Sequence, residues 1–136
     1  MKNLFLLLTL LTSLLKAQDI AVVASNSFDA TKLSKAEIKR IFLSKTNYIN
    51  NKRIHVLEIK NTSYKRDFYK KVSGKSPVQL RSYWTTLIFT GKAQPPKQIK
   101  DMQELIQLLL KDSKAISYIP LDAVTKDMKV LYTMKE

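Results

Sequence analysis

Hydrophobic positions recur along the chain in two patterns, short continuous runs and helical spacing. Continuous apolar runs at 20–24 and 115–119 predict two buried strands, and a partly alternating stretch at 53–59 predicts another. A last short strand is expected at 130–132. Because the predicted strands alternate with helical segments, the pattern predicts one α/β domain, a mixed sheet with helices on both faces.

Helical segments are marked by apolar residues three and four positions apart and by start signals. Ser34 with Glu37, and Asp101 with Glu104, have the three-residue spacing that is typical of the N-terminal end of a helix. Helices are therefore expected at four places: 34–43, 64–72, 76–91 and 101–110.

The helix that starts near Ser76 is predicted to be the core element on which the sheet packs. Ser76 and Gln79 can form a capping box, and Gly91 ends the helix. Its apolar face is formed by Leu80, Trp84, Leu87 and Ile88. Trp84 is the single Trp of the chain, and we expect it to be buried in the core.

The first 17 residues have the pattern of a secretory signal peptide. Lys2 provides positive charge, an apolar run follows at 4–15, and Ala17 is a small residue at the expected cleavage position. The run is shorter than the roughly 18 residues that a transmembrane helix needs. We therefore expect cleavage after Ala17, export to the periplasm, and a mature domain of residues 18–136 without a transmembrane segment.

The chain is strongly basic and has no cysteine. It carries 24 Lys and Arg against 11 Asp and Glu, a formal net charge of +13, and removal of 1–17 takes away two lysines. Export argues against nucleic acid as the partner, so the anionic partners that remain are small oxyanions, lipid head groups, cell-wall polymers or an acidic protein. Without cysteine the domain has neither disulfides nor thiol chemistry.

No group of residues predicts catalysis or a bound cofactor. His55 is the single histidine, and without cysteine or a second histidine it cannot form a zinc site. No nucleophile motif accompanies it, so the sequence does not support a Ser-His-Asp triad. We expect His55 to be an exposed or hydrogen-bonded structural residue, and the protein to be a non-enzyme that needs no metal and no cofactor.

Short polar residues connect the strand at 53–59 to the helix at 64–72. Asn61, Thr62 and Ser63 can each cap this helix, and Lys65 and Arg66 add positive charge. A helix N-terminus has free backbone N–H groups and the positive end of the helix dipole, so this junction is a candidate anion site. The alternative is an ordinary helix cap surrounded by solvated basic residues.

Ser25 and Asn26 form a polar loop directly after the first predicted strand. Ligands of α/β sheets bind beyond the carboxyl ends of the strands. We therefore expect that Ser25 and Asn26 could approach the same anion site as the junction at 61–66.

Four stretches resemble a known family. They are LSKAEIKRIFLSK at 33–45, RDFY at 66–69, YWTTLIFTGKAQPP at 83–96 and AISYI at 115–119. Together they resemble the small, single-domain members of the phosphate-binding-protein-like family, the substrate-binding proteins of phosphate ABC transporters. The third stretch is the most specific of the four. The resemblance implies a fold like one lobe of a type II periplasmic binding protein.

In two-lobed members of that family, phosphate is held between the lobes, partly by a Ser-Gly-Thr-type turn at a helix N-terminus. The resemblance places this turn at 61–64, where Ser63 can keep the hydroxyl. Tyr64 replaces the glycine, and Glu58 and Ile59 stand where the family usually has an arginine.

Two functions from different classes are therefore expected. The first is an exported solute-binding-type module that binds phosphate or a similar small oxyanion weakly at a helix N-terminus. Tight binding by one lobe would require a homodimer or another partner as the second lobe. The alternative is an envelope protein–protein interaction module that has lost ligand binding and docks on an acidic partner.

Overall fold

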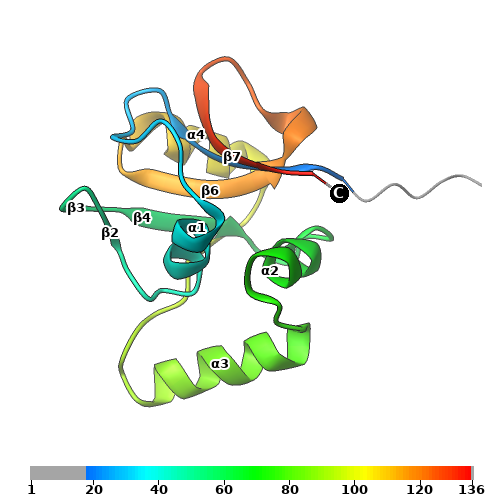
Figure 1. The fold of residues 1–136 in the computed structure, drawn as a ribbon. Coiled ribbons are helices and arrows are strands. Elements are labelled where there is room, and N and C mark those ends of the chain that lie inside the picture. The colour runs from blue at the N-terminus through cyan, green and yellow to red at the C-terminus, as the bar shows by residue number, and fades with distance from the viewer. Residues whose placement is uncertain (1–17, 136) are drawn as a thin grey trace, which may run out of the picture.

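A computed structural model describes residues 18–135 of the chain (Figure 1). The predicted signal peptide at 1–17 lies outside the described residues. None of the helices in the described part is long and apolar enough to cross a membrane.

The centre of the fold is a five-stranded sheet in the order β5-β4-β6-β1-β7. Its strands are β1 (Ile20–Ser25), β4 (His55–Ile59), β5 (Lys97–Ile99), β6 (Ala115–Pro120) and β7 (Met128–Met134). β4 is parallel to both β5 and β6, whereas β1 is antiparallel to both β6 and β7. The mixed sheet that the sequence predicts is therefore confirmed.

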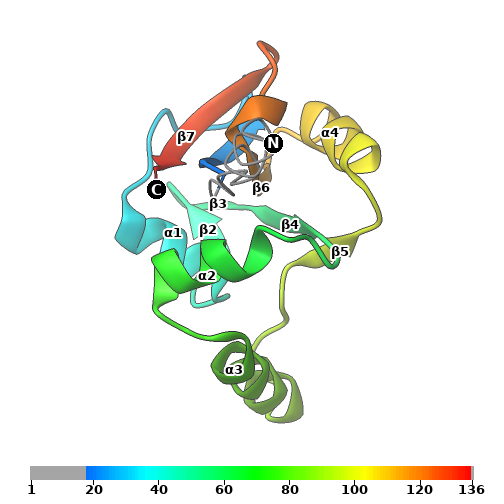
Figure 2. The same cartoon turned by 90° about the vertical axis from the view of Figure 1, so that its right-hand side faces the viewer.

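Helices cover both faces of this sheet, also as predicted. They are α1 (Lys35–Phe42) and α2 (Lys65–Ser73) on one face and α4 (Met102–Lys111) on the other (Figures 1 and 2). The predicted capping box of Ser34 and Glu37 starts α1, and the Asp101 side chain accepts a hydrogen bond from the Glu104 N–H at the start of α4.

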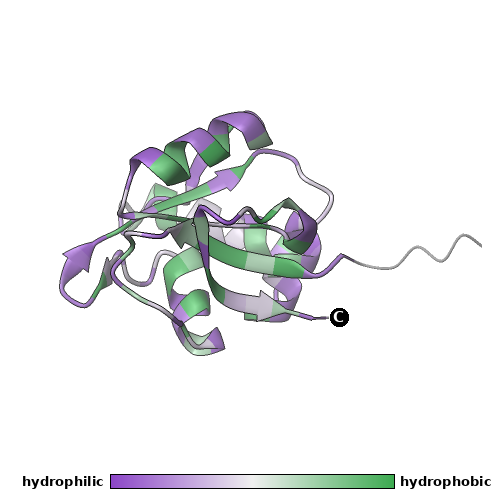
Figure 3. Ribbon diagram, turned by 90° about the horizontal axis from the view of Figure 1, so that it is seen from above, coloured by the Kyte–Doolittle hydropathy of each residue, from purple (hydrophilic) through white to green (hydrophobic). Residues whose placement is uncertain are grey.

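Alternate residues of each central strand face the two sides of the sheet. Ile20, Val22 and Ala24 of β1 join the hydrophobic cluster under α1 and α2, whereas Ala21 and Val23 join the cluster under α4. β1 and β6 are buried along their whole length because helices cover both sides. Figure 3 shows hydrophobic colouring along the central strands and in bands on the helices.

Four aromatic rings form the centre of the cluster under α1 and α2. Phe68 of α2 stacks on Tyr118 of β6, with ring centroids 3.7 Å apart and an interplanar angle of 5°. Phe42 and Tyr69 contact Phe68 edge to face at 5.0 and 5.2 Å. This packing fixes α2 against the sheet and so sets the position of its N-terminus.

The helix α3 (Pro77–Phe89) is where the structure differs most from the prediction. The capping box of Ser76 and Gln79 is present, but α3 does not pack on the sheet. It lies outside α1 and α2 (Figures 1 and 2). Leu80 is the one buried residue of α3, while Ile88 and Phe89 are 56% and 90% exposed.

The expectation of a fully buried Trp84 is therefore wrong. Trp84 and Tyr83 are only partly buried, at the edge of the cluster that contains Leu80. The Tyr83 hydroxyl donates to the Leu43 carbonyl at 2.6 Å and ties α3 to the end of α1. The physical reason is that α1 and α2 already cover this face of the sheet, so α3 reaches only their outer surface.

Three short elements were not predicted. A two-residue turn joins β2 (Tyr48–Ile49) to β3 (Lys52–Arg53) in a small ribbon. The turn residues Asn50 and Asn51 both have positive φ, which Asn tolerates better than most residues. β5 has two polar residues, Lys97 and Gln98, and one buried apolar residue, Ile99.

Candidate functional site

The N-terminus of α2 has no side-chain cap. The N-cap residue is Tyr64, whose side chain makes no capping hydrogen bond. The expectation that Asn61, Thr62 or Ser63 caps this helix is therefore wrong. The first N–H groups of a helix have no partner within the helix, so the first turn of α2 keeps backbone donors and the positive dipole end available.

The predicted site residues at 61–66 lie around this uncapped turn. Asn61 is exposed and has a left-handed backbone with φ of 58°, which lets the chain turn sharply after β4. Ser63 and Arg66 are also exposed. The hydroxyl oxygens of Thr62 and Tyr64 are buried, and neither has a hydrogen-bond partner. The turn thus combines solvent-facing donors with two buried hydroxyls whose hydrogen bonds are unmade.

Lys65 pairs with a buried carboxylate that was not predicted to be part of the site. Its Nζ atom lies 3.4 Å from Oε1 of Glu58, whose side chain is 1% exposed. Glu58 also accepts hydrogen bonds from the hydroxyls of Tyr118 at 2.9 Å and Tyr69 at 3.2 Å, and from the Gln98 amide at 3.0 Å. The partners of Glu58 are all donors, so the carboxylate is fully satisfied.

The environment of Glu58 keeps the neighbouring phenols protonated. Burial raises the pKa of Tyr69 well above its ordinary value, and the negative charge of Glu58 raises it further. The same two causes raise the pKa of Tyr118. Burial also raises the pKa of Tyr64, and the negative charge of Glu58 adds to this effect.

This network decides which residues can contribute to an anion site. A free anion would be repelled by Glu58, so the buried side of the turn is closed to it. Lys65 is occupied as the counter-ion of Glu58. The exposed side offers Ser63, Arg66 and the backbone donors of α2.

Ser25 and Asn26 were expected to approach this turn, but they do not. The directions of the strands explain why. β1 is antiparallel to β6, and β6 is parallel to β4, so the carboxyl ends of β1 and β4 lie at opposite edges of the sheet. The Ser25 hydroxyl contacts that of Ser27 at 2.9 Å, and the Asn26 amide donates to the Lys126 carbonyl.

His55 is exposed and hydrogen-bonded, as expected. Its Nδ1 lies 2.7 Å from Oδ2 of Asp112, at the end of β4 that is remote from α2. Burial alone would raise the pKa of Asp112, but the hydrogen bonds from His55 and from the Lys114 N–H outweigh it, and the pKa is lowered. Residues 18–135 contain no group of His, Asp and Glu that could hold a metal ion.

The sequence matches no protein-family model and no curated protein. The structure, however, is similar to solved proteins. A protein from Vibrio cholerae described as an ABC-type phosphate transport receptor aligns over 84% of this chain with a TM-score of 0.62 and 15% identity. A protein from Clostridium perfringens, solved with bound phosphate and provisionally assigned as a phosphate ABC transporter substrate-binding protein, aligns over 84% with a TM-score of 0.63 and 18% identity.

A third protein, from Planctomyces limnophilus and considered a phosphate-binding candidate, aligns over 84% of this chain with a TM-score of 0.55 and 12% identity. The chain spans less than half the length of each of these proteins, 45%, 44% and 40% respectively. At this level of identity the similarity establishes the fold. The α/β domain has a periplasmic-binding-protein-like fold.

Proposed function

We propose that this chain is a solute-binding-type module that binds phosphate or a similar small oxyanion at the N-terminus of α2. The observation that carries the proposal is the uncapped first turn of α2, with Ser63 and Arg66 exposed beside it. Its fold is shared with a protein that has been solved with bound phosphate. Helix N-termini favour anions through their free N–H groups and their dipole.

Each residue of the turn has a distinct part in this proposal. Ser63 donates its hydroxyl, and Arg66 provides the charge and planar donors suited to phosphate. The hydroxyl of Thr62 is buried and does not contact the anion, so Thr62 contributes only as part of the turn. Lys65 adds positive potential that Glu58 largely cancels. Ser25 and Asn26 belong to the opposite edge of the sheet and take no part.

The affinity is expected to be low because the site is open on one side. A helix N-terminus contributes about 0.3–1 kcal/mol and a charge-assisted hydrogen bond about 1.5–3 kcal/mol. After the cost of association, a dissociation constant of roughly a millimolar follows. Tighter binding would need a second copy or another protein to close the site. The alternative function, an interaction module without a ligand, would use the exposed residues of α3, and nothing in the structure shows what covers them.

Titration calorimetry with inorganic phosphate tests the site. Arg66→Gln is expected to weaken phosphate binding about tenfold, the loss of one charge-assisted contact. The matched control is Arg81→Gln, which removes an exposed arginine from α3 and should leave the affinity unchanged. We leave Lys65 intact, since its removal would unpair the buried Glu58 and confuse binding with stability.

Two results would contradict the proposal. One is the absence of measurable heat with phosphate at concentrations well above the millimolar range. The other is an equal loss of affinity in Arg66→Gln and Arg81→Gln. This would show that the affinity for phosphate depends only on the net charge of the protein.

We also propose that the protein is exported and works in the periplasm, with a mature chain that starts at Gln18. The support is the sequence pattern at 1–17. Intact-mass spectrometry of the protein purified from the bacterial envelope is expected to give residues 18–136. A mass that corresponds to a start at Met1 would refute export by cleavage.

A further inference from the structure

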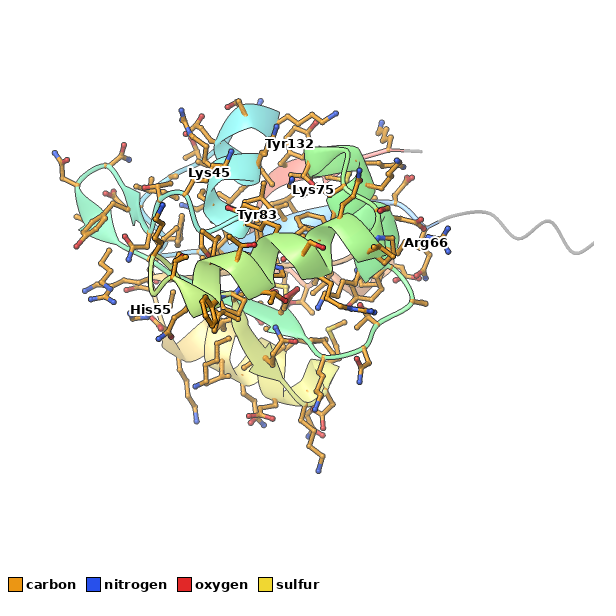
Figure 4. All side chains as sticks on the ribbon, turned by 90° about the horizontal axis from the view of Figure 1, so that it is seen from below. Lys45, His55, Arg66, Lys75, Tyr83 and Tyr132 are labelled. Atoms are coloured by element: carbon orange, nitrogen blue, oxygen red, sulfur yellow. The ribbon has the colours of Figure 1, made fainter. Side chains whose placement is uncertain are left out.

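A second basic region lies at the other end of β4, away from the turn at 61–66. An open groove of about 800 Å³ is bounded by the segment after α1, the start of β4, the connection from α3 to β5, and the end of α4. β4 has five residues, so its two ends are about 13 Å apart at the usual rise of a strand. Figure 4 shows His55 and Arg66 toward opposite ends of α3.

The charges that line this groove are almost all positive. Lys45, Arg53, Lys92 and Lys97 line it from three separate segments. Within the part of the chain that the structure describes, these four side chains make no salt bridge. Asp112 is the one acidic residue that lines the groove, and its Oδ2 atom lies 2.7 Å from Nδ1 of His55. The groove therefore has four cations without counter-ions.

The walls of the groove are fixed to one another by hydrogen bonds. The Ser44 hydroxyl donates to the Gln94 carbonyl at 2.6 Å and joins the segment after α1 to the connection before β5. The Ile54 N–H donates to the Asn47 carbonyl at 2.8 Å. The contact of His55 with Asp112 fixes the end of α4 to β4. The cations thus extend from a preformed frame rather than from free loops.

We propose that this groove binds a linear chain of linked phosphate groups. Its volume is in the range of pockets that hold ligands much larger than orthophosphate. The four cations lie on three separate segments of the groove wall, so a ligand with several anionic groups can contact more of them than a ligand with one anionic group. An oligophosphate carries charge at every link and can contact several lysines at once, and lysine is a common phosphate partner. This site is separate from the one proposed at α2.

The test is titration of residues 18–136 with inorganic tripolyphosphate. The double variant Lys92→Gln/Lys97→Gln is expected to bind tripolyphosphate at least about tenfold more weakly. The matched control, Lys70→Gln/Lys100→Gln, removes the same charge from exposed positions outside the groove and should change the affinity less than about twofold.

A second measurement works on the unaltered protein. Amide chemical shifts are expected to change at His55, Lys92 and their neighbours in the groove at lower tripolyphosphate concentrations than at 61–66. The proposal is overturned if the wild-type protein does not bind tripolyphosphate, or if the two double variants lose affinity equally. It is also overturned if citrate binds as tightly, or if the shifts are confined to 61–66.

Discussion

Replacing Glu58 by alanine is expected to lower the free energy of unfolding by about 3–5 kcal/mol, the range seen when one partner of a buried ion pair is removed. The carboxylate accepts from Tyr69, Tyr118 and Gln98 and pairs with Lys65. Its loss leaves two buried phenol groups without an acceptor and opens a cavity among them. Each unsatisfied buried donor costs about 1–3 kcal/mol.

Urea denaturation followed by circular dichroism measures this change. Glu104→Ala serves as the matched control, because Glu104 is an exposed glutamate on α4, and its replacement should alter stability by less than about 0.5 kcal/mol. Tyr118→Phe should lie between the two, at about 1 kcal/mol, since it removes one hydrogen bond and keeps the ring. If Glu58→Ala unfolds at the same urea concentration as wild type, the carboxylate is not the centre of this network.

The second large effect is expected at Phe68. Its ring is fully buried and stacks on Tyr118, with Phe42 and Tyr69 edge-on around it. Phe68→Ala removes this contact surface and leaves a cavity under α2, for which the usual cost is about 3–5 kcal/mol. The N-terminus of α2 is positioned by the same packing, so phosphate binding should weaken together with stability.

Thermal and urea unfolding of Phe68→Ala should be compared with Phe89→Ala. Phe89 is 90% exposed at the end of α3, and its replacement is expected to change stability by less than about 0.5 kcal/mol. Because the same substitution is made at both positions, any difference in stability between the two variants reflects the burial of Phe68. Similar midpoints for the two variants would mean that the aromatic cluster under α2 contributes little to stability.

The local signals in the sequence were sufficient for the starts of α1 and α3, but not for the start of α2, where Tyr64 and none of the predicted cap residues is the N-cap. Ser34 with Glu37 and Ser76 with Gln79 form the predicted capping boxes because each depends on residues only three apart. The position of α3 depends instead on the other helices, because α1 and α2 occupy the face of the sheet on which α3 was expected to pack. The spacing of Leu80, Trp84 and Ile88 indicates an apolar face but not the layer in which it lies.

Site prediction failed where it depended on strand direction or on long-range contacts. Ser25 follows a strand whose direction in the sheet is set by its partners β6 and β7, and no local residue encodes that direction. Glu58 lies within a largely apolar strand. A single acidic residue in such a strand indicates that its carboxylate is buried and has hydrogen-bond partners. Its donors Tyr118 and Gln98 are 60 and 40 residues away in the sequence.

The attachment of α3 has a consequence for the cooperativity of the fold. Gly74 and Gly91, both with left-handed φ angles, lie on either side of the helix, and Leu80 is its one buried anchor. Such an element can detach while the sheet and its other helices stay folded. In native-state hydrogen exchange, the amides of α3 are expected to form an opening unit of low free energy, whereas those of β1 and β6 should exchange only through global unfolding.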